Sequence, residues 1–181
     1  MPEVFKKHYA NRPFSNDEYV VEGHLNVECS GPIKFLAPLL RWMGSIPPEN
    51  EQYVPVKVIF RSEPDSKDFV FDREFCFSSR RYCFHSKMRQ VSGDQVVEIM
   101  KFGIIWKMQY LWDKDRVRLR HSGYGLHLFG KVIPLPLGFL IGGGDAEEVA
   151  VDDLHFDMCV AVTHPLWGKI YRYSGRFEVK S

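Results

Sequence analysis

Residues 69–91 read FVFDREFCFSSRRYCFHSKMRQV, and this stretch decides the fold. Apolar and polar side chains alternate on both sides of Ser79-Arg80, which is the pattern of two half-buried strands joined by a turn. A hairpin with this centre pairs Phe75 with Phe84 on one face and Glu74 with His85 on the other. Apolar side chains thus oppose apolar ones, and charged side chains oppose side chains of the opposite charge. The same register also pairs Phe71 with Met88, Phe77 with Tyr82, Asp72 with Lys87, and Cys76 with Cys83.

Arg73 breaks this alternation, because it falls on the aromatic face, opposite Ser86. A guanidinium cannot be buried without a partner. With Ser92-Gly93-Asp94 as the next loop, Glu98 falls on the same face, roughly 12 Å from Arg73 between α-carbons, and Ser86 or a water can bridge the gap. We therefore expect Arg73 and Glu98 to meet, either as an ion pair that fixes register or as a polar anchor in an apolar ligand cavity. The register of this second hairpin pairs Met88 with Glu98, Ser86 with Met100, and Phe84 with Phe102.

The two-residue period extends from this hairpin over most of the chain. Tyr19 to Cys29 alternates in the same way, and the period returns at Gln52 and persists to the C-terminus. So many one-sided strands in series predict a strongly curved antiparallel sheet, a barrel or half-barrel of about nine or ten strands. Beyond those already described, strands are expected at 95–102, 104–113, 115–121, 125–133, 147–151, 154–163 and 169–179.

Two helices are expected near the N-terminus, at 3–10 and at 32–43. Pro38 should kink the second helix, and Gly44 with Pro47-Pro48 should end it. The fold class is therefore α+β and mostly β, with the two helices packed on the curved sheet. Its length of 181 residues predicts a single domain over 1–181.

Composition and motifs exclude several functions. Lys and Arg number 24 against 23 Asp and Glu, so no basic excess indicates nucleic acid, and the row from Lys114 to Arg120 is interpreted as a solvated face. Gly142-Gly143-Gly144 is interpreted as a flexible loop, because the acidic residues that follow would repel phosphate. No dinucleotide or metal-binding spacing is present, so we expect no cofactor and no metal.

The four cysteines and the absence of a secretory signal predict reduced thiols and a cytoplasmic location.

Residues 132–141 form an apolar segment that contains Pro134 and Pro136. Because proline cannot continue a helix or a central strand, we expect this segment to stay outside the sheet. We favour a cap that closes a cavity and moves on its glycines. The alternatives are that it covers the helix at 32–43 or makes peripheral contact with a membrane or a partner. The segment is too short for a transmembrane helix, which needs about 20 residues.

A set of motifs resembles a bacterial family catalogued as domain of unknown function 4166. The resemblance covers most of the chain and implies a stand-alone copy of a domain that is elsewhere fused behind dehydrogenase-like, NAD(P)-binding modules or to membrane proteins. It implies no activity and no catalytic residues, and without a dinucleotide fingerprint no cofactor is carried over. The motif residues are Arg73, Phe75, Glu98, Gly103, Gly130, Pro134 to Leu137, Glu147-Glu148, Phe156-Asp157, Pro165 to Gly168, Tyr171, Tyr173 and Gly175, with His8-Tyr9 and Gly23 fitting loosely.

Three functional hypotheses follow, and the sequence specifies no reaction. The first is a binding domain for a small apolar or amphipathic molecule in an aromatic-lined cavity, with Arg73, Glu98, Ser86, Phe75 and Tyr173 as ligand-binding residues. The second is an enzyme acting on a similar ligand through Arg73, Glu98, Asp157 or His8. The third is a protein-interaction module with a filled core. No residue pattern specifies an oligomeric state.

Overall fold

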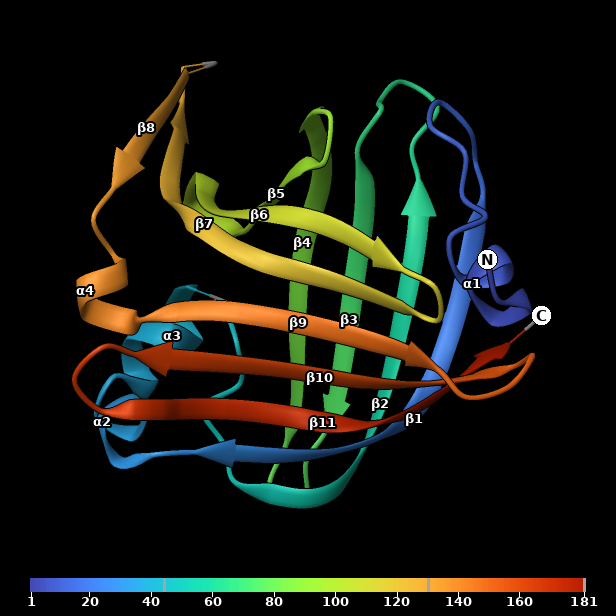
Figure 1. The fold of residues 1–181 in the computed structure, drawn as a ribbon. Helices are drawn as coiled ribbons and strands as arrows, with labels where there is room; N and C mark the ends of the chain where they lie inside the picture. Colours follow the sequence, from blue (N-terminus) through green and yellow to red (C-terminus); the bar gives the residue numbers. More distant parts are fainter. Residues whose placement is uncertain (44, 130, 181) are drawn as a thin grey trace.

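Eleven antiparallel strands form one sheet in the described part of the chain, and ten of them close into a barrel (Figure 1). The computed structural model describes residues 1–43, 45–129 and 131–180; Gly44 and Gly130, named above, lie outside these ranges. Consecutive strands are neighbours around the ring, and pairing of β6 with β7 closes it. The strands are β1 (Glu18–Cys29), β2 (Glu51–Ser62), β3 (Phe69–Cys76), β4 (Arg81–Ser92), β5 (Gln95–Ile99), β6 (Ile104–Asp113), β7 (Arg116–Leu128), β8 (Lys131–Leu135), β9 (Gly143–Ala150), β10 (His155–His164) and β11 (Gly168–Lys180).

Helices lie at both ends of the barrel. At one end α1 (Glu3–His8) buries Val4 and Phe5 completely. At the other end α2 (Gly31–Phe35), α3 (Ala37–Met43) and α4 (Gly138–Ile141) lie together, at the left of the view in Figure 1. Together with the strands they confirm the predicted α+β, mostly β class and the barrel. None of the helices in the described residues is long and apolar enough to cross a membrane.

The alternation predicted for the first strand is confirmed in β1. Val21, Leu25, Val27 and Cys29 are buried, while Glu22, His24, Asn26 and Glu28 are exposed. The pairing of β1 with β2 shifts between Leu25 and Val27, and that of β10 with β11 shifts between Val162 and Thr163. Such irregularities increase the bend of a strand, which a closed barrel requires.

The register predicted for the hairpin of residues 69–91 is wrong by two residues. Arg73 lies opposite Phe84, and Phe71 lies opposite Ser86. A shift of two keeps each side chain on its predicted face, because the side-chain period of a strand is two. The turn moves because Phe77 leaves the strand to fill the core and Ser78 donates its backbone N–H and hydroxyl to the Glu51 carboxylate. Cys76 and Cys83 are therefore not paired; they face Arg81 and Glu74.

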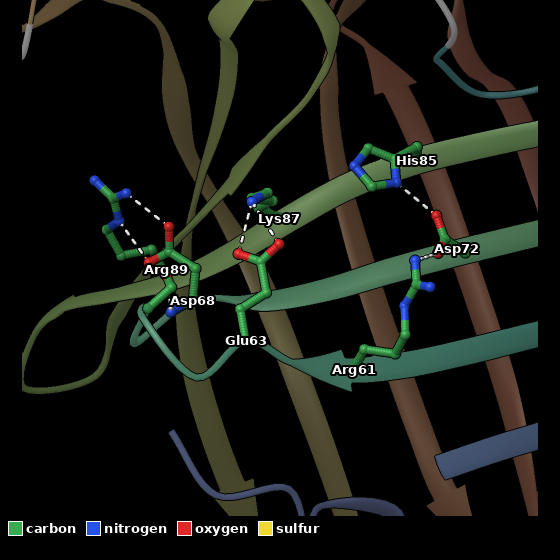
Figure 2. Close-up of polar contacts among 8 residues, drawn as sticks. Arg61, Glu63, Asp68, Asp72, His85, Lys87 and Arg89 are labelled. Carbon is green, nitrogen blue, oxygen red and sulfur yellow. Dashed lines mark hydrogen bonds and ion pairs between the residues drawn. The ribbon is translucent and has the colours of Figure 1, made fainter. Parts of the chain in front are cut away.

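The corrected register reassigns the ion pairs on the outer face of β2, β3 and β4 (Figure 2). Asp72 contacts His85 and Arg61 instead of Lys87. Lys87 pairs with Glu63 at 2.8 Å. Beyond them, two hydrogen bonds of 2.7 and 2.6 Å join Arg89 to Asp68. Acidic side chains still lie beside basic ones, so the charged side chains of this outer face would have partners of opposite charge in both the predicted and the observed register.

Three predicted elements differ from the structure. The helix predicted at 32–43 is two helices, because Pro38 has no N–H to donate and its ring clashes with the preceding turn. Residues 115–121 and 125–128 belong to one strand, β7. β9 begins at Gly143 instead of 147. Gly143 and Gly144 fit in this strand because they have no side chain: a Cβ on Gly143 would lie 3.1 Å from the His121 ring, and one on Gly144 would lie 3.2 Å from the Trp106 ring.

The apolar segment 132–141 is partly in the sheet, which corrects the expectation that its prolines keep it out. β8 pairs with the second half of β7 and stands outside the closed ring. Pro134 lies opposite Gly125 in this edge strand, where a missing donor is tolerated. After Pro136 the chain forms α4, whose backbone carbonyl at Phe139 contacts His164 Nε2 at 2.9 Å.

Two motif glycines lie where β1 and β11 approach most closely. A Cβ on Gly175 would be 1.9 Å from the carbonyl oxygen of His24, and one on Gly23 would be 2.1 Å from that of Arg176. These distances leave no room for a side chain at either of these two positions. The two glycines therefore allow the first and last strands to pair.

We expect Gly175→Ala to destabilise the protein by about 1–3 kcal/mol or more, because the added methyl group overlaps the backbone of β1. Gly31→Ala is the matched control: a Cβ there meets no described atom within 4 Å, and the change should stay within about 1 kcal/mol. Urea unfolding of both variants measures the difference. Equal stability of the two variants would contradict the close approach.

Candidate functional site

The barrel encloses a cavity of about 220 Å³. Its walls are almost entirely apolar, and Val58, Phe75, Ala146, Val160 and Phe177 are among the side chains that form them. It extends from His8 and Tyr9, at the C-terminal end of α1, to Leu39 of α3 and Leu140 of α4. Leu39 and Leu140 are 45% and 51% exposed, so the cavity reaches the surface between these two helices.

Arg73, Ser86 and Glu98 form a buried polar triad, of which Arg73 and Glu98 line the cavity while Ser86 does not. Arg73 Nη1 donates to Ser86 Oγ at 2.9 Å, Ser86 Oγ donates to Glu98 Oε1 at 2.6 Å, and Arg73 Nη2 lies 2.9 Å from the same carboxylate oxygen. The Arg73 side chain is 11% exposed and that of Glu98 is 4% exposed. This geometry confirms the predicted contact, both directly and through Ser86.

Strand register produces the triad. Glu98 lies opposite Met88, as predicted, and Ser86 is two residues from Met88 on the same face of β4. Arg73 lies opposite Phe84, again two residues from Ser86, so the three polar residues follow one diagonal across β3, β4 and β5. The pairings predicted for Met100 and Phe102 are absent from the described ladder, because β5 ends at Ile99 and Phe102 turns outward with a positive φ of 62°.

Two aromatic rings hold the Arg73 guanidinium. Its Cζ lies 5.1 Å from the centre of the Phe71 ring and 4.8 Å from that of Phe84. Rings at this distance attract a cation through their quadrupole while excluding water from it. The buried charge is thus compensated on three sides, by Glu98 and by the two rings.

A second polar group, at the α1 end of the cavity, consists of His8, Tyr9 and Glu148. Tyr9 donates its hydroxyl to Glu148 Oε2, and His8 Nε2 lies 3.4 Å from the same oxygen. Burial alone would raise the pKa of Glu148, but His8, the Tyr9 hydroxyl and Arg73 outweigh burial and lower it. The His8 side chain is 1% exposed, and its Nδ1 has no hydrogen-bond partner among the described residues.

Sequence reasoning missed Glu148 as an interior residue. The sequence predicts an acidic stretch after a flexible glycine loop and a strand at 147–151 with no inward-facing carboxylate, whereas Glu148 of β9 lines the cavity. The signal available was alternation: Ala146 faces inward, while Glu147 faces outward and accepts a 2.8 Å hydrogen bond from Arg118. A strand that starts at Gly143 would have placed Glu148 on the inner face.

Tyr173 lines the cavity within electrostatic reach of both polar groups. It is buried, and its ring centre is 6.1 Å from that of Phe75. Burial raises the pKa of Tyr173; Arg73 opposes this shift, whereas Glu98 and Glu148 add to it. At the α1 end, burial together with Glu148 raises the pKa of Tyr110 to about 12. Both tyrosines therefore stay neutral and can donate hydrogen bonds.

Asp157 does not join the site. It lies on the outer face of β10, where Arg176 binds it through two hydrogen bonds of 2.7 and 3.0 Å. His155 contacts Asp152 on the same outer face. Among the described residues, no group of three His, Cys, Asp or Glu side chains could hold a metal ion. Of the residues proposed for an enzyme, Arg73, Glu98 and His8 are the ones that share the cavity.

Comparison with known proteins gives one match. The family model described as a domain of unknown function, DUF4166, matches residues 1–177. This match confirms the resemblance, including the N-terminal helix, whose His8-Tyr9 fits only loosely. No curated protein and no solved structure matches the chain.

A double-mutant cycle tests the Arg73–Glu98 pair. We expect Glu98→Leu alone to cost about 3–5 kcal/mol, because it leaves a buried guanidinium without a countercharge. Combining it with Arg73→Met should recover most of that loss, since an apolar pair of similar volume needs no partner. Chemical unfolding of the wild type, both single variants and the double variant gives the coupling energy. Additive effects would contradict a direct interaction.

The pH dependence of stability tests Glu148. Because its pKa is lowered in the folded state, its contribution is present above the ordinary glutamate pKa of about 4.3 and is lost as pH falls through the folded value. We expect the unfolding free energy of the wild type to fall more steeply between about pH 5 and 3 than that of Glu148→Gln. Parallel curves would contradict a lowered pKa.

Proposed function

We propose that this chain, which belongs to the family of the domain of unknown function DUF4166, binds a small apolar or amphipathic molecule inside its barrel. Arg73, Glu98 and Ser86 anchor the polar end of the molecule, and Phe75 and Tyr173 contact its apolar body. The ligand enters between α3 and α4, where Leu39 and Leu140 line the cavity and are exposed.

The observation that carries this proposal is a buried ion pair, Arg73 with Glu98, that faces an apolar cavity. A buried ion pair adds little net stability compared with well-packed apolar residues, so stability alone does not account for it. Ligand sites, by contrast, are mostly apolar with a few convergent polar groups. An unfilled space beside the triad favours binding over a protein-interaction module with a filled core.

The size of the cavity limits the ligand. Drug-sized molecules occupy pockets of roughly 300–1,000 Å³, which is more than the 220 Å³ found here. An apolar cavity of about 150 Å³ holds benzene. The enclosed part of the ligand therefore has about ten non-hydrogen atoms, with any longer part extending through the opening between α3 and α4.

The interior charges indicate a ligand with a neutral polar end. Arg73 is already balanced by Glu98, and Glu148 adds a further negative charge that only a protonated His8 would balance. The cavity thus has no unpaired positive charge for a carboxylate. His8 Nδ1, buried and without a described partner, offers a hydrogen bond to a hydroxyl or carbonyl group.

The enzyme hypothesis has weaker support. A carboxyl group that acts as a general acid near neutral pH needs a raised pKa, whereas the pKa of Glu148 is lowered. Asp157, which was to serve as a catalytic residue, pairs with Arg176 outside the barrel.

Two matched probes test the proposal, with native mass spectrometry of the purified protein to detect a co-purified molecule. We expect 2-naphthol to bind, and 2-naphthoate to bind at least about tenfold more weakly, because its carboxylate meets Glu98 and Glu148. Ala146→Leu should abolish binding by filling the cavity, while the protein still melts cooperatively. Ala161→Leu, on the neighbouring strand but facing outward, is the control.

Several outcomes would contradict the proposal. Binding of 2-naphthol that survives Ala146→Leu would place the probe outside the cavity. Tighter binding of the carboxylate would refute the neutral polar end. A wild type that binds neither probe and carries no small molecule would favour a structural role.

A cytoplasmic location stays a prediction, and reduced cysteines are a separate one that can be tested directly. Cys29, Cys76, Cys83 and Cys159 are all free in the structure. We expect four reactive thiols after denaturation, without reductant, of protein made in a reducing cytoplasm. Two or fewer thiols, with oxidation during purification excluded, would contradict this expectation.

A further inference from the structure

The connections between strands divide the surface of the barrel into two ends. Because each strand is antiparallel to its neighbour in sequence, successive connections alternate between the ends. Connections 30–50, 77–80, 100–103, 129–142 and 165–167 join strands at the end that carries α2, α3 and α4, which we term the helical end; within 129–142 the β7–β8 hairpin projects away from these helices, toward the top of Figure 1. Connections 63–68, 93–94, 114–115 and 151–154 lie at the opposite end, with α1.

Exposed apolar side chains concentrate at the helical end. Phe35, Phe129, Phe139 and Leu166 come from three different connections, and each is more than four-fifths exposed. Twelve of the 20 exposed large apolar side chains among the described residues lie at this end. The other eight of these twelve are Leu39, Trp42, Phe102, Leu128, Val132, Ile133, Leu140 and Trp167.

Contacts between these segments make the surface continuous. Trp42 of α3 stacks on Phe102, with ring centres 4.5 Å apart. Gly103, next to Phe102, lies so close to β7 that a Cβ would be 2.5 Å from the carbonyl oxygen of His127. On the other side of the opening, His164 contacts the Phe139 carbonyl oxygen of α4 and stacks on Trp167. The apolar side chains of α3, α4 and the 165–167 connection therefore surround the entrance to the cavity, and those of the β7–β8 hairpin extend this surface beyond Phe102.

Charge is distributed unequally between the two ends. The connections at the helical end carry five basic residues and one acidic residue, Glu49, which pairs with Arg41 and Arg80. The strand connections at the opposite end carry seven acidic and two basic residues. The N-terminal segment 1–17 adds three basic and two acidic residues there. No Asp or Glu occurs anywhere from 116 to 144.

We propose that the helical end docks onto the surface of a membrane that contains anionic lipid. Aromatic and aliphatic side chains projecting from several loops insert among the headgroups, and nearby Lys34, Lys101 and Lys131 attract the lipid phosphates. A second copy of the chain fits less well, because its helical end would bring the same positive charge. The acidic opposite end then faces away from the membrane.

Docking would place the opening between α3 and α4 against the lipid. An apolar ligand could then pass between the bilayer and the cavity without crossing water, which is unfavourable for apolar surface. This consequence rests on the proposed binding function. The docking itself does not, since it follows from the surface residues alone.

Vesicle binding by the full chain, without any probe ligand, tests the proposal. We expect co-sedimentation with vesicles of phosphatidylcholine and phosphatidylserine to exceed that with phosphatidylcholine alone by at least about tenfold, and to weaken with salt. The fluorescence of the wild type should shift to the blue on binding, and Trp42→Phe with Trp167→Phe should remove most of that shift.

Paired variants locate the contact. Phe139→Ser with Leu166→Ser should reduce vesicle binding roughly tenfold or more, since each removes an exposed apolar side chain from the headgroup region. Lys101→Glu with Lys131→Glu should remove the preference for phosphatidylserine. Phe14→Ser with Val91→Ser changes exposed apolar side chains at the opposite end and should have no effect. Circular dichroism and thermal melting confirm that each variant is folded.

Three results would overturn the proposal. The first is no binding to either vesicle, and the second is equal loss of binding in the control variant. The third is a concentration-dependent dimer that Phe139→Ser abolishes while vesicles are not bound, which would make the helical end a self-interface. Failure of 2-naphthol binding would overturn the ligand proposal and leave vesicle binding unaffected, so the two failures are distinguishable.

Discussion

The antiparallel pairing of β6 with β7 is the constraint on which the rest of the structure depends. These strands pair along the whole of β6, from Ile104–Leu126 to Asp113–Arg116, and thereby join the two halves of the sheet. Without this pairing, β6 would expose a long unpaired edge, and the inner faces of β3–β5 and β9–β11 would not be held around one interior. Closure turns strands that are apolar on one face into a barrel that encloses a cavity. Two polar groups line this cavity, Arg73 with Glu98 and His8 with Glu148.

Closure also explains why a guanidinium in an apolar wall can be tolerated. Arg73 takes its countercharge from two strands away, so the triad forms only when β3, β4 and β5 all turn these side chains to the inner face. A slip of one residue in any of these strands would turn its polar side chain toward solvent, whereas a slip of two keeps the side chain on the inner face. The ion pair and the ligand anchor are therefore compatible roles, because the charges that fix the inward face of these strands also line the cavity.

The sequence was sufficient to predict which side chains of each strand point inward, but not which residues pair across every two strands. Alternation identified the inward side of each strand, including Arg73 and Glu98, because the period of two survives any even shift in register. The turn of the first hairpin was misplaced because two registers both match charge with charge, and Glu51, distant in sequence, selects between them by binding Ser78. Glu148 was missed for a related reason. Consecutive glycines favour a loop when only the local sequence is considered. In the fold, the rings of His121 and Trp106 from other strands pack against Gly143 and Gly144 and occupy the space that side chains would need, which the local sequence cannot show.

The asymmetry between the two ends follows from the same topology. In a barrel whose strands simply follow one another, every second connection is at the same end, so composition can differ between ends without disturbing the strands. Acidic turns such as Asp94 and Asp152-Asp153 stay solvated at one end. The α2–α3 and β8–α4 insertions, both at the other end, are long enough to carry helices and exposed aromatic side chains. The opening to the cavity lies between these two insertions, so the polarity of the surface and the access to the interior have one structural origin.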